Sequence, residues 1–158
     1  MLKSYRQLVA APSYGRAADA GLLVLRLGVF ISLFLKHGLE KVDPAFWSEM
    51  ATKFPDPAHI GHLPSLTVAM ISDFVCSILL VLGLFSRAAA TYVFVVLAVA
   101  WAFTHHFIYF GKGIEPKHGE LILIYVTVSL SLALLGPGRY SLDRLIWNRL
   151  SMKESAVA

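Results

Sequence analysis

The stretch from Ala88 to Phe103 constrains the fold more than any other part of the chain, because it contains no charged side chain and almost no polar one. A surface helix of a soluble bundle would show a polar face over such a length. A buried helix of a large soluble protein could lack one, but 158 residues are too few to surround several helices of this kind. We therefore expect this stretch to cross a lipid bilayer.

Three further apolar runs accompany it, and the four predicted spans cover roughly residues 17–37, 65–85, 88–110 and 119–135. A helix that crosses a hydrocarbon core of about 30 Å needs about 20 residues, and each run approaches that length with its flanks. The sequence therefore predicts an all-α fold, with residues 1–158 forming a single membrane domain built as a four-helix transmembrane bundle.

The composition agrees with a membrane protein, since 57% of the residues are hydrophobic and only 15% are charged. The net charge of +4 does not indicate a nucleic-acid-binding protein, because Lys and Arg flank the apolar runs instead of clustering on one polar face. Cys76 is the single cysteine, which excludes an intrachain disulfide and a CxxC redox pair. An enzyme resembling vitamin K epoxide reductase is therefore excluded, since its chemistry needs a dithiol.

Two shorter helices are predicted outside the spans. In the long first loop, Asp43-Pro44 is typical of an N-cap followed by Pro at the first helical position. Three apolar residues then recur every four positions: Phe46, Met50 and Phe54. They predict a short amphipathic helix. After the fourth span, residues 142–150 place apolar side chains on one face and basic ones elsewhere, which predicts a C-terminal interfacial helix.

The distribution of Lys and Arg predicts the orientation. The N-terminal segment, the connection at Arg87 and the C-terminal segment are richer in these residues than the first and third connections. By the positive-inside rule, both termini are expected to be cytoplasmic and the long first loop exterior. We expect the first apolar run to be a retained span and not a cleavable signal, because Arg26 interrupts it and no small-residue cleavage site follows.

Ionisable side chains in the spans mark the candidate site, because a charge at membrane depth is costly unless it is paired or functional. Arg26, His37 and Lys41 lie on nearly one face of the first predicted helix, and Asp73 lies within the second. The later spans add four more candidates: Trp101, His105, His106 and Glu120. In the predicted topology these residues line a polar pocket open to the exterior, with Arg26 and Asp73 paired at its floor.

Simpler interpretations stay open. Arg26 and Asp73 could form a purely structural ion pair, the two histidines could mark the water interface, and Glu120 in a first helical turn is favourable for the helix dipole alone. A metal site is disfavoured, because adjacent histidines diverge by about 100° on a helix and no HxxxH spacing is present in the sequence. The convergence of four helices at one end favours a small-molecule pocket.

Four short segments carry a resemblance to a known family. They read GLLVLR at 21–26, HGLEK at 37–41, GLFSRAA at 83–89 and GPGRYSLD at 136–143. The first two resemble the LLRL…HGxxK start of the DoxX family of small bacterial membrane proteins, and the third resembles its GLFTRxAA signature. The closing segment, with His105 and Glu120, is similar to later features of the family. The resemblance covers nearly the whole chain in the same order.

This resemblance implies a four-helix protein of the bacterial cytoplasmic (inner) membrane. Some members are associated with respiratory or sulfur-oxidising complexes, including a subunit of a thiosulfate:quinone oxidoreductase, and others with membrane complexes of oxidative-stress defence. We therefore expect a subunit of an oxidoreductase complex whose outward pocket binds a quinone or a similar small molecule. The sequence has no haem, flavin, nicotinamide or iron–sulfur signature, so electrons would come from a partner subunit or a diffusible donor.

The alternative is a non-catalytic carrier or assembly factor that holds a lipid, a peptide or a metal for a partner. Four helices are few for an alternating-access transporter, and no inverted repeat is visible in the sequence. A homo-oligomer would overcome that limit. Membrane lipid, together with a partner subunit or a second copy of the chain, is the expected surrounding in either case.

Overall fold

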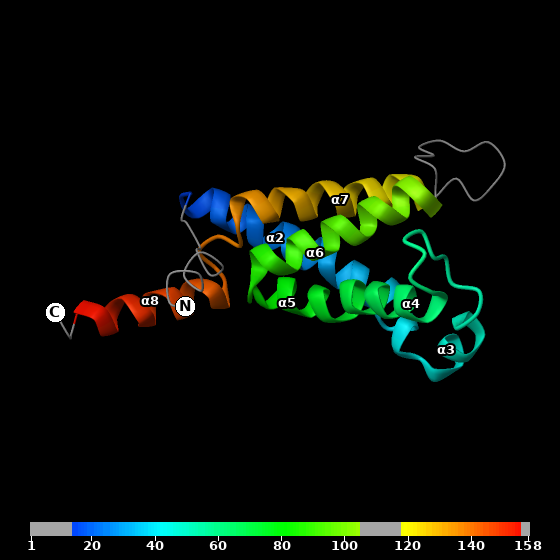
Figure 1. The fold of residues 1–158 in the computed structure, drawn as a ribbon. Helices are drawn as coiled ribbons and strands as arrows, with labels where there is room; N and C mark the ends of the chain where they lie inside the picture. Colours follow the sequence, from blue (N-terminus) through cyan, green and yellow to red (C-terminus); the bar gives the residue numbers. More distant parts are fainter. Residues whose placement is uncertain (1–13, 105–117, 156–158) are drawn as a thin grey trace.

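Helices make up the regular structure of the residues that the computed structural model describes, which are 14–104 and 118–155 (Figure 1). The first long helix is α2, Arg16–Leu33, continued by the π turn η1, Phe34–Gly38. The following loop carries the 3₁₀ turn η2, Glu40–Val42, and the short helix α3, Pro44–Met50.

The second long helix joins α4, His62–Met70, the π turn η3, Ile71–Cys76, and α5, Ser77–Leu82. The third long helix joins α6, Ser86–Val99, to the π turn η4, Ala100–Thr104. Two further helices follow: α7, His118–Leu135, and α8, Leu142–Ser155.

Three of these helices are long and apolar enough to cross a bilayer: Arg16–Gly38, His62–Leu82 and Ser86–Phe103. α7 contributes a shorter apolar stretch, Glu120–Leu135. The predicted all-α, multi-pass membrane architecture is thus confirmed for three spans, while the crossing by α7 stays a prediction. The C-terminal helix is also confirmed, and α8 extends beyond the expected residues 142–150.

The long helices pack side by side around one apolar core (Figure 1). α2 contacts α5 and α7, and α6 contacts α7 and η3. The centre of the core is formed by fully buried side chains: Phe30, Leu33, Leu80, Val93 and Leu132. Large apolar side chains such as Val24 and Leu134 lie exposed on the outer surface, as expected where the surrounding medium is lipid.

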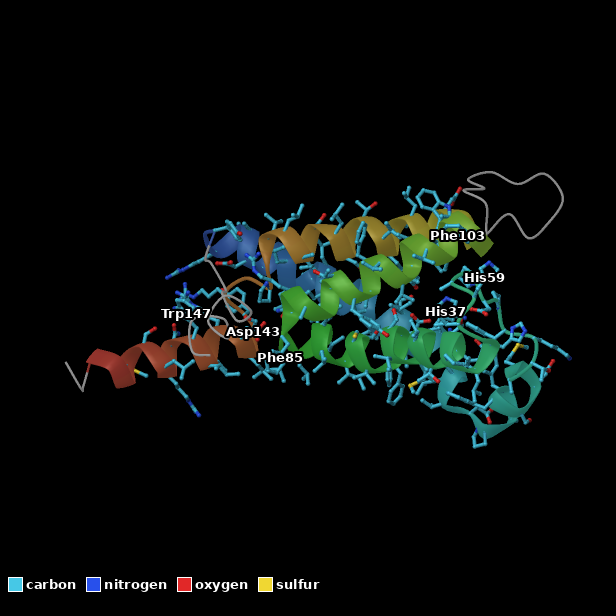
Figure 2. All side chains as sticks on the ribbon, viewed as in Figure 1. His37, His59, Phe85, Phe103, Asp143 and Trp147 are labelled. Carbon is cyan, nitrogen blue, oxygen red and sulfur yellow. The ribbon has the colours of Figure 1, made fainter. Side chains whose placement is uncertain are left out.

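The closing segment of the chain folds against the turn between the second and third long helices. This turn uses two residues in left-handed conformation, Gly83 with φ 69° and Phe85 with φ 48°. Both carboxylate oxygens of Asp143 accept backbone hydrogen bonds at the start of α6, from Phe85 N at 2.8 Å and Ser86 N at 2.9 Å. The Asp143 amide in turn donates to the Gly83 carbonyl. Figure 2 shows Phe85 and Asp143 together at this end of the bundle.

The two shorter helices differ in part from expectation. Asp43 caps α3 as predicted, since its carboxylate accepts a hydrogen bond from Ala45 N at 2.9 Å. The predicted amphipathic repeat is wrong for Phe54, however, because α3 ends at Met50 and the chain turns through a proline-rich segment. α8 projects from the end of the bundle (Figure 1), and its interfacial placement stays a prediction.

Candidate ligand-binding site

Arg26 does not pair with Asp73, contrary to the expectation from the sequence. The Arg26 guanidinium is fully buried and donates to the carbonyl of Leu80 at 3.3 Å and to the carbonyl of Tyr140. The carboxylate of Asp143 supplies the negative charge with which it interacts. Arg26 therefore belongs to the packing of the closing segment and does not form the floor of a pocket with Asp73.

The register of the helices explains this correction. A Cβ added to Gly38 would lie 2.5 Å from the carbonyl oxygen of Asp73, and one added to Gly83 would clash with the Arg26 guanidinium. Asp73 is thus level with Gly38, about 18 Å along α2 from Arg26 at 1.5 Å per residue. Helical side chains also lean toward their own N-terminus, which in antiparallel helices separates the two charges further.

Asp73 pairs instead with Lys41. The Lys41 Nζ lies 2.8 Å from Asp73 Oδ2 and donates a second hydrogen bond to the carbonyl of His37 at 3.3 Å. The two side chains are only 10% and 7% exposed. Asp73 Oδ1 is buried and has no hydrogen-bond partner among residues 14–104 and 118–155. A buried ion pair with an unsatisfied oxygen is costly, and a ligand can bond to that oxygen where a cavity reaches it.

Two cavities reach the Lys41/Asp73 pair. The smaller has a volume of about 280 Å³ and is lined by Leu33, His37, Asp73, Leu97, Ala100, Leu121, Ile122 and Tyr125. The larger has a volume of about 480 Å³ and lies among α4, α6 and the proline-rich loop, with Lys41 and Ser65 as further polar residues. Asp73, Leu97 and Ala100 line both cavities. A charged group thus sits between two largely apolar chambers, an arrangement typical of small-molecule sites.

Each of the first three long helices contains one π turn near the Lys41/Asp73 pair: η1, η3 and η4. These turns contain His37, Asp73 and Ala100, so each contributes one residue that lines the smaller cavity. A π turn inserts an i→i+5 hydrogen bond into the helix and is frequent at functional sites. Three of them at one level indicate that the backbone departs from regular helix to make this site.

The smaller cavity also holds hydrogen-bonding groups besides the ion pair. The Tyr125 hydroxyl lies 3.1 Å from Ser32 Oγ, and the ring of Tyr125 meets that of His37 edge to face with centroids 6.3 Å apart. Tyr125 comes from α7 and is 3% exposed. The cavity therefore brings an imidazole and a phenol to the level of Asp73.

Asp56 holds the loop beside the larger cavity. Its carboxylate accepts hydrogen bonds from Ser65 Oγ at 2.7 Å, Gly61 N at 2.7 Å and Ile60 N at 3.0 Å. The hydrogen bond from Ser65, followed by those from the two backbone amides, lowers the pKa of Asp56 below its ordinary value. Because Ser65 and Ile60 line the larger cavity, this carboxylate fixes part of its wall.

The remaining predicted residues have different outcomes. Trp101 lies in η4 and is half-buried, but it lines neither cavity. Glu120 is exposed near the start of α7 and forms no hydrogen bond or ion pair with His37, Lys41 or any other residue that the structure describes, so its predicted place among them is not supported. His105 and His106 lie outside the described residues. Within the described chain, no cluster of three or more His, Cys, Asp or Glu could hold a metal ion.

Sequence reasoning missed Tyr125 and the proline-rich loop as parts of the site. Leu121 and Tyr125 are one helical turn apart, and a tyrosine inside an apolar span needs a partner for its hydroxyl. That signal was available in the sequence. The contribution of Pro55 and Pro57 depends on how the loop folds over α4 and had no periodic signal.

The comparisons with known proteins identify the family. The sequence profile of the DoxX family matches residues 21–106, which is more than half of the chain. This chain belongs to the DoxX family. The matched residues include all four of the charged or titratable candidates on the first two long helices: Arg26, His37, Lys41 and Asp73.

Two relatives come from Haemophilus influenzae, and both are described as uncharacterized proteins. One is 33% identical over 137 residues, which cover 84% of this chain and 87% of the relative. The other is 39% identical over 90 residues, which cover 54% of this chain and 65% of the relative. No solved structure matches the chain. The comparisons thus establish a bacterial DoxX membrane protein, and the activity has to be argued from the site.

Proposed function

We propose that this DoxX protein is an inner-membrane subunit of an oxidoreductase complex and that the cavities at the Lys41/Asp73 pair bind a quinone. One observation carries the proposal: a buried ion pair with an unpartnered carboxylate oxygen lies between two apolar cavities. A structural ion pair would be expected to have its oxygens satisfied, as those of Asp143 are at the other end of the bundle.

The two cavities match the two parts of a quinone. The smaller one offers hydrogen-bonding groups of His37 and Tyr125 beside the apolar side chains of Leu33 and Leu97, which suits a quinone head group with two carbonyl oxygens on its ring. The larger one is lined mainly by apolar side chains of α4, α6 and the loop, which suits an isoprenoid chain. Their volumes, about 280 and 480 Å³, are of the size of small-molecule sites.

We further propose that α7 is a fourth span, that both termini are cytoplasmic and that the cavities open outward. The Lys and Arg distribution supports this orientation. In this arrangement a quinone dissolved in the bilayer reaches the site sideways between α4 and α6. Electrons would come from a partner subunit or a diffusible donor, since the residues described here provide the binding site and proton-bearing groups.

Ala100 offers a direct test because it lines both cavities. Ala100→Leu should fill the space beside Asp73 and lower the amount of quinone that remains bound after extraction in a mild detergent at least tenfold, measured by native mass spectrometry. Ala88→Leu is the matched control, since Ala88 is exposed at the opposite end of the same helix. Wild-type protein that carries no quinone and shows no rise in melting temperature with added quinone would contradict the proposal.

A carrier of membrane lipid is the second candidate. It is favoured by the exposed Glu120, which leaves the site without one of the ionisable side chains that were expected to line the pocket. The same mass spectra separate the two candidates, because a carrier would retain a phospholipid in place of a quinone. Loss of that phospholipid in Ala100→Leu but not in Ala88→Leu would assign it to the cavities.

A further inference from the structure

The hydrogen bonds of the Lys41/Asp73 pair are unequally satisfied. Lys41 Nζ has three N–H donors and uses two of them, on Asp73 Oδ2 and on the carbonyl of His37. Asp73 Oδ1 is a carboxylate oxygen, which can only accept, and it has no donor among the described residues. Lys41 lines the larger cavity and Asp73 lines both, so the pair offers one donor and one acceptor side by side to a ligand in these cavities.

We propose that this site selects the reduced form of its ligand, binding a quinol in preference to the corresponding quinone. The inference rests on the proposed function, because it names the redox state of the molecule that the same cavities hold. A hydroxyl group can accept from Lys41 Nζ and donate to Asp73 Oδ1 at once. A quinone carbonyl can only accept, so it satisfies Lys41 and leaves Asp73 Oδ1 buried without a donor.

The burial of the pair makes this difference large. Asp73 is 7% exposed at its side chain, so little bulk water reaches the unpaired oxygen when a ligand fills the cavities. A buried charged group without a hydrogen bond is more costly than a neutral one. Sites built to bond a hydroxyl therefore discriminate strongly against an analogue that lacks it. We expect the quinol to bind at least about tenfold more tightly than the quinone.

The test compares decylubiquinol with decylubiquinone on the full-length protein in detergent, under anaerobic conditions with dithionite keeping the quinol reduced. The dissociation constants are measured by quenching of tryptophan fluorescence. The Asp73→Asn variant replaces the acceptor-only carboxylate by an amide that can also donate. It should bring the ratio of the two constants to about one or invert it. Glu40→Gln is the matched control, because Glu40 is exposed at the same end and lines neither cavity.

Tighter binding of the quinol by wild type and Glu40→Gln, with the preference lost in Asp73→Asn, would support the inference. Equal binding of both forms by the wild type, or tighter binding of the quinone, would overturn it and leave the proposed quinone site intact. Binding of neither form would overturn the proposed function itself and this inference with it. If Asp73→Asn fails to fold, the ratio for the wild type still decides between these outcomes.

Discussion

At the scale of single residues, two aspartates in this protein perform different tasks. Asp143 is fully buried, and each of its carboxylate oxygens accepts a backbone hydrogen bond at the start of α6. Asp73 is almost as buried, yet only one of its oxygens is bonded, to Lys41. Full satisfaction is what a structural carboxylate requires, whereas the open oxygen of Asp73 is available for a ligand.

Replacing Asp143 should destabilise the fold. Asp143→Asn keeps one acceptor, turns an NH₂ group toward the second backbone N–H and removes the charge that faces Arg26. We expect the free energy of unfolding in detergent to fall by about 1–3 kcal/mol, because a buried donor is left unpaired. Denaturant titration followed by circular dichroism measures this change.

Asp43→Asn is the control for that experiment. Asp43 also caps a helix, α3, but it is exposed, and asparagine caps helices as well as aspartate does. Its free energy of unfolding should stay within about 0.5 kcal/mol of the wild type. Equal effects of the two substitutions would show that the buried position of Asp143 adds nothing to an ordinary cap.

At the scale of elements, close packing of η1 on η3 fixes the site. Gly38 allows this approach, since the Cβ of any other residue would meet the backbone of Asp73. The contact holds Lys41, one turn further along, at the depth of the Asp73 carboxylate. Helix register, more than the local sequence around each charge, therefore decides which charges pair.

Gly38→Ala tests that packing. The added methyl group meets a backbone atom and not a flexible side chain, so the helices have to separate locally. We expect helical content to persist while quinone affinity drops at least tenfold. Gly28→Ala is the control, because nothing lies within 4 Å of its added Cβ and alanine favours a helix. Unchanged quinone binding in Gly38→Ala would contradict a role for this contact in the site.

Periodicity explains which elements could be predicted. The uncharged run from Ala88 and the Asp43-Pro44 start of α3 carry local signals, and both are helical where expected. The π turns carry no such signal, because the same residues would also suit a regular helix. Their position is therefore known from the structure alone.

The sequence alone predicts that charges within the membrane are compensated, but it does not predict which groups compensate them. The expectation that intramembrane charges are compensated is met by both Arg26 and Asp73. Arg26 donates instead to backbone carbonyls and interacts with the charge of Asp143, while Asp73 pairs with Lys41, because the closing segment folds against the bundle and the helix register separates Arg26 from Asp73. Both the fold of the closing segment and the helix register depend on contacts between residues far apart in the sequence.

At the scale of the whole molecule, the two ends of the bundle differ in what surrounds their buried charges. At one end Arg26 and Asp143 bond to backbone atoms around the turn at Gly83, and neither side chain lines either of the two cavities. At the other end the Lys41/Asp73 pair borders two cavities. Figure 2 shows His37 and Phe103 at this second end, opposite Asp143 and Phe85. The buried charges are thus packed against protein at one end of the bundle and border the two cavities at the other.

The central claim, an outward-facing site that holds a quinone, can be tested with one cysteine-labelling measurement. Ala58 is exposed and lines the larger cavity, and Cys76 is the single native cysteine and is buried. In a Cys76→Ser background, Ala58→Cys is treated with a membrane-impermeant maleimide in right-side-out vesicles, with and without decylubiquinone. Glu49→Cys, exposed on α3 and outside both cavities, is the control.

We expect both cysteines to react from the outside, and decylubiquinone to slow the labelling of Ala58→Cys at least fivefold while leaving Glu49→Cys unchanged. Labelling that requires opening of the vesicles would contradict the outward orientation. Labelling of Ala58→Cys at the same rate with and without saturating quinone would contradict the site.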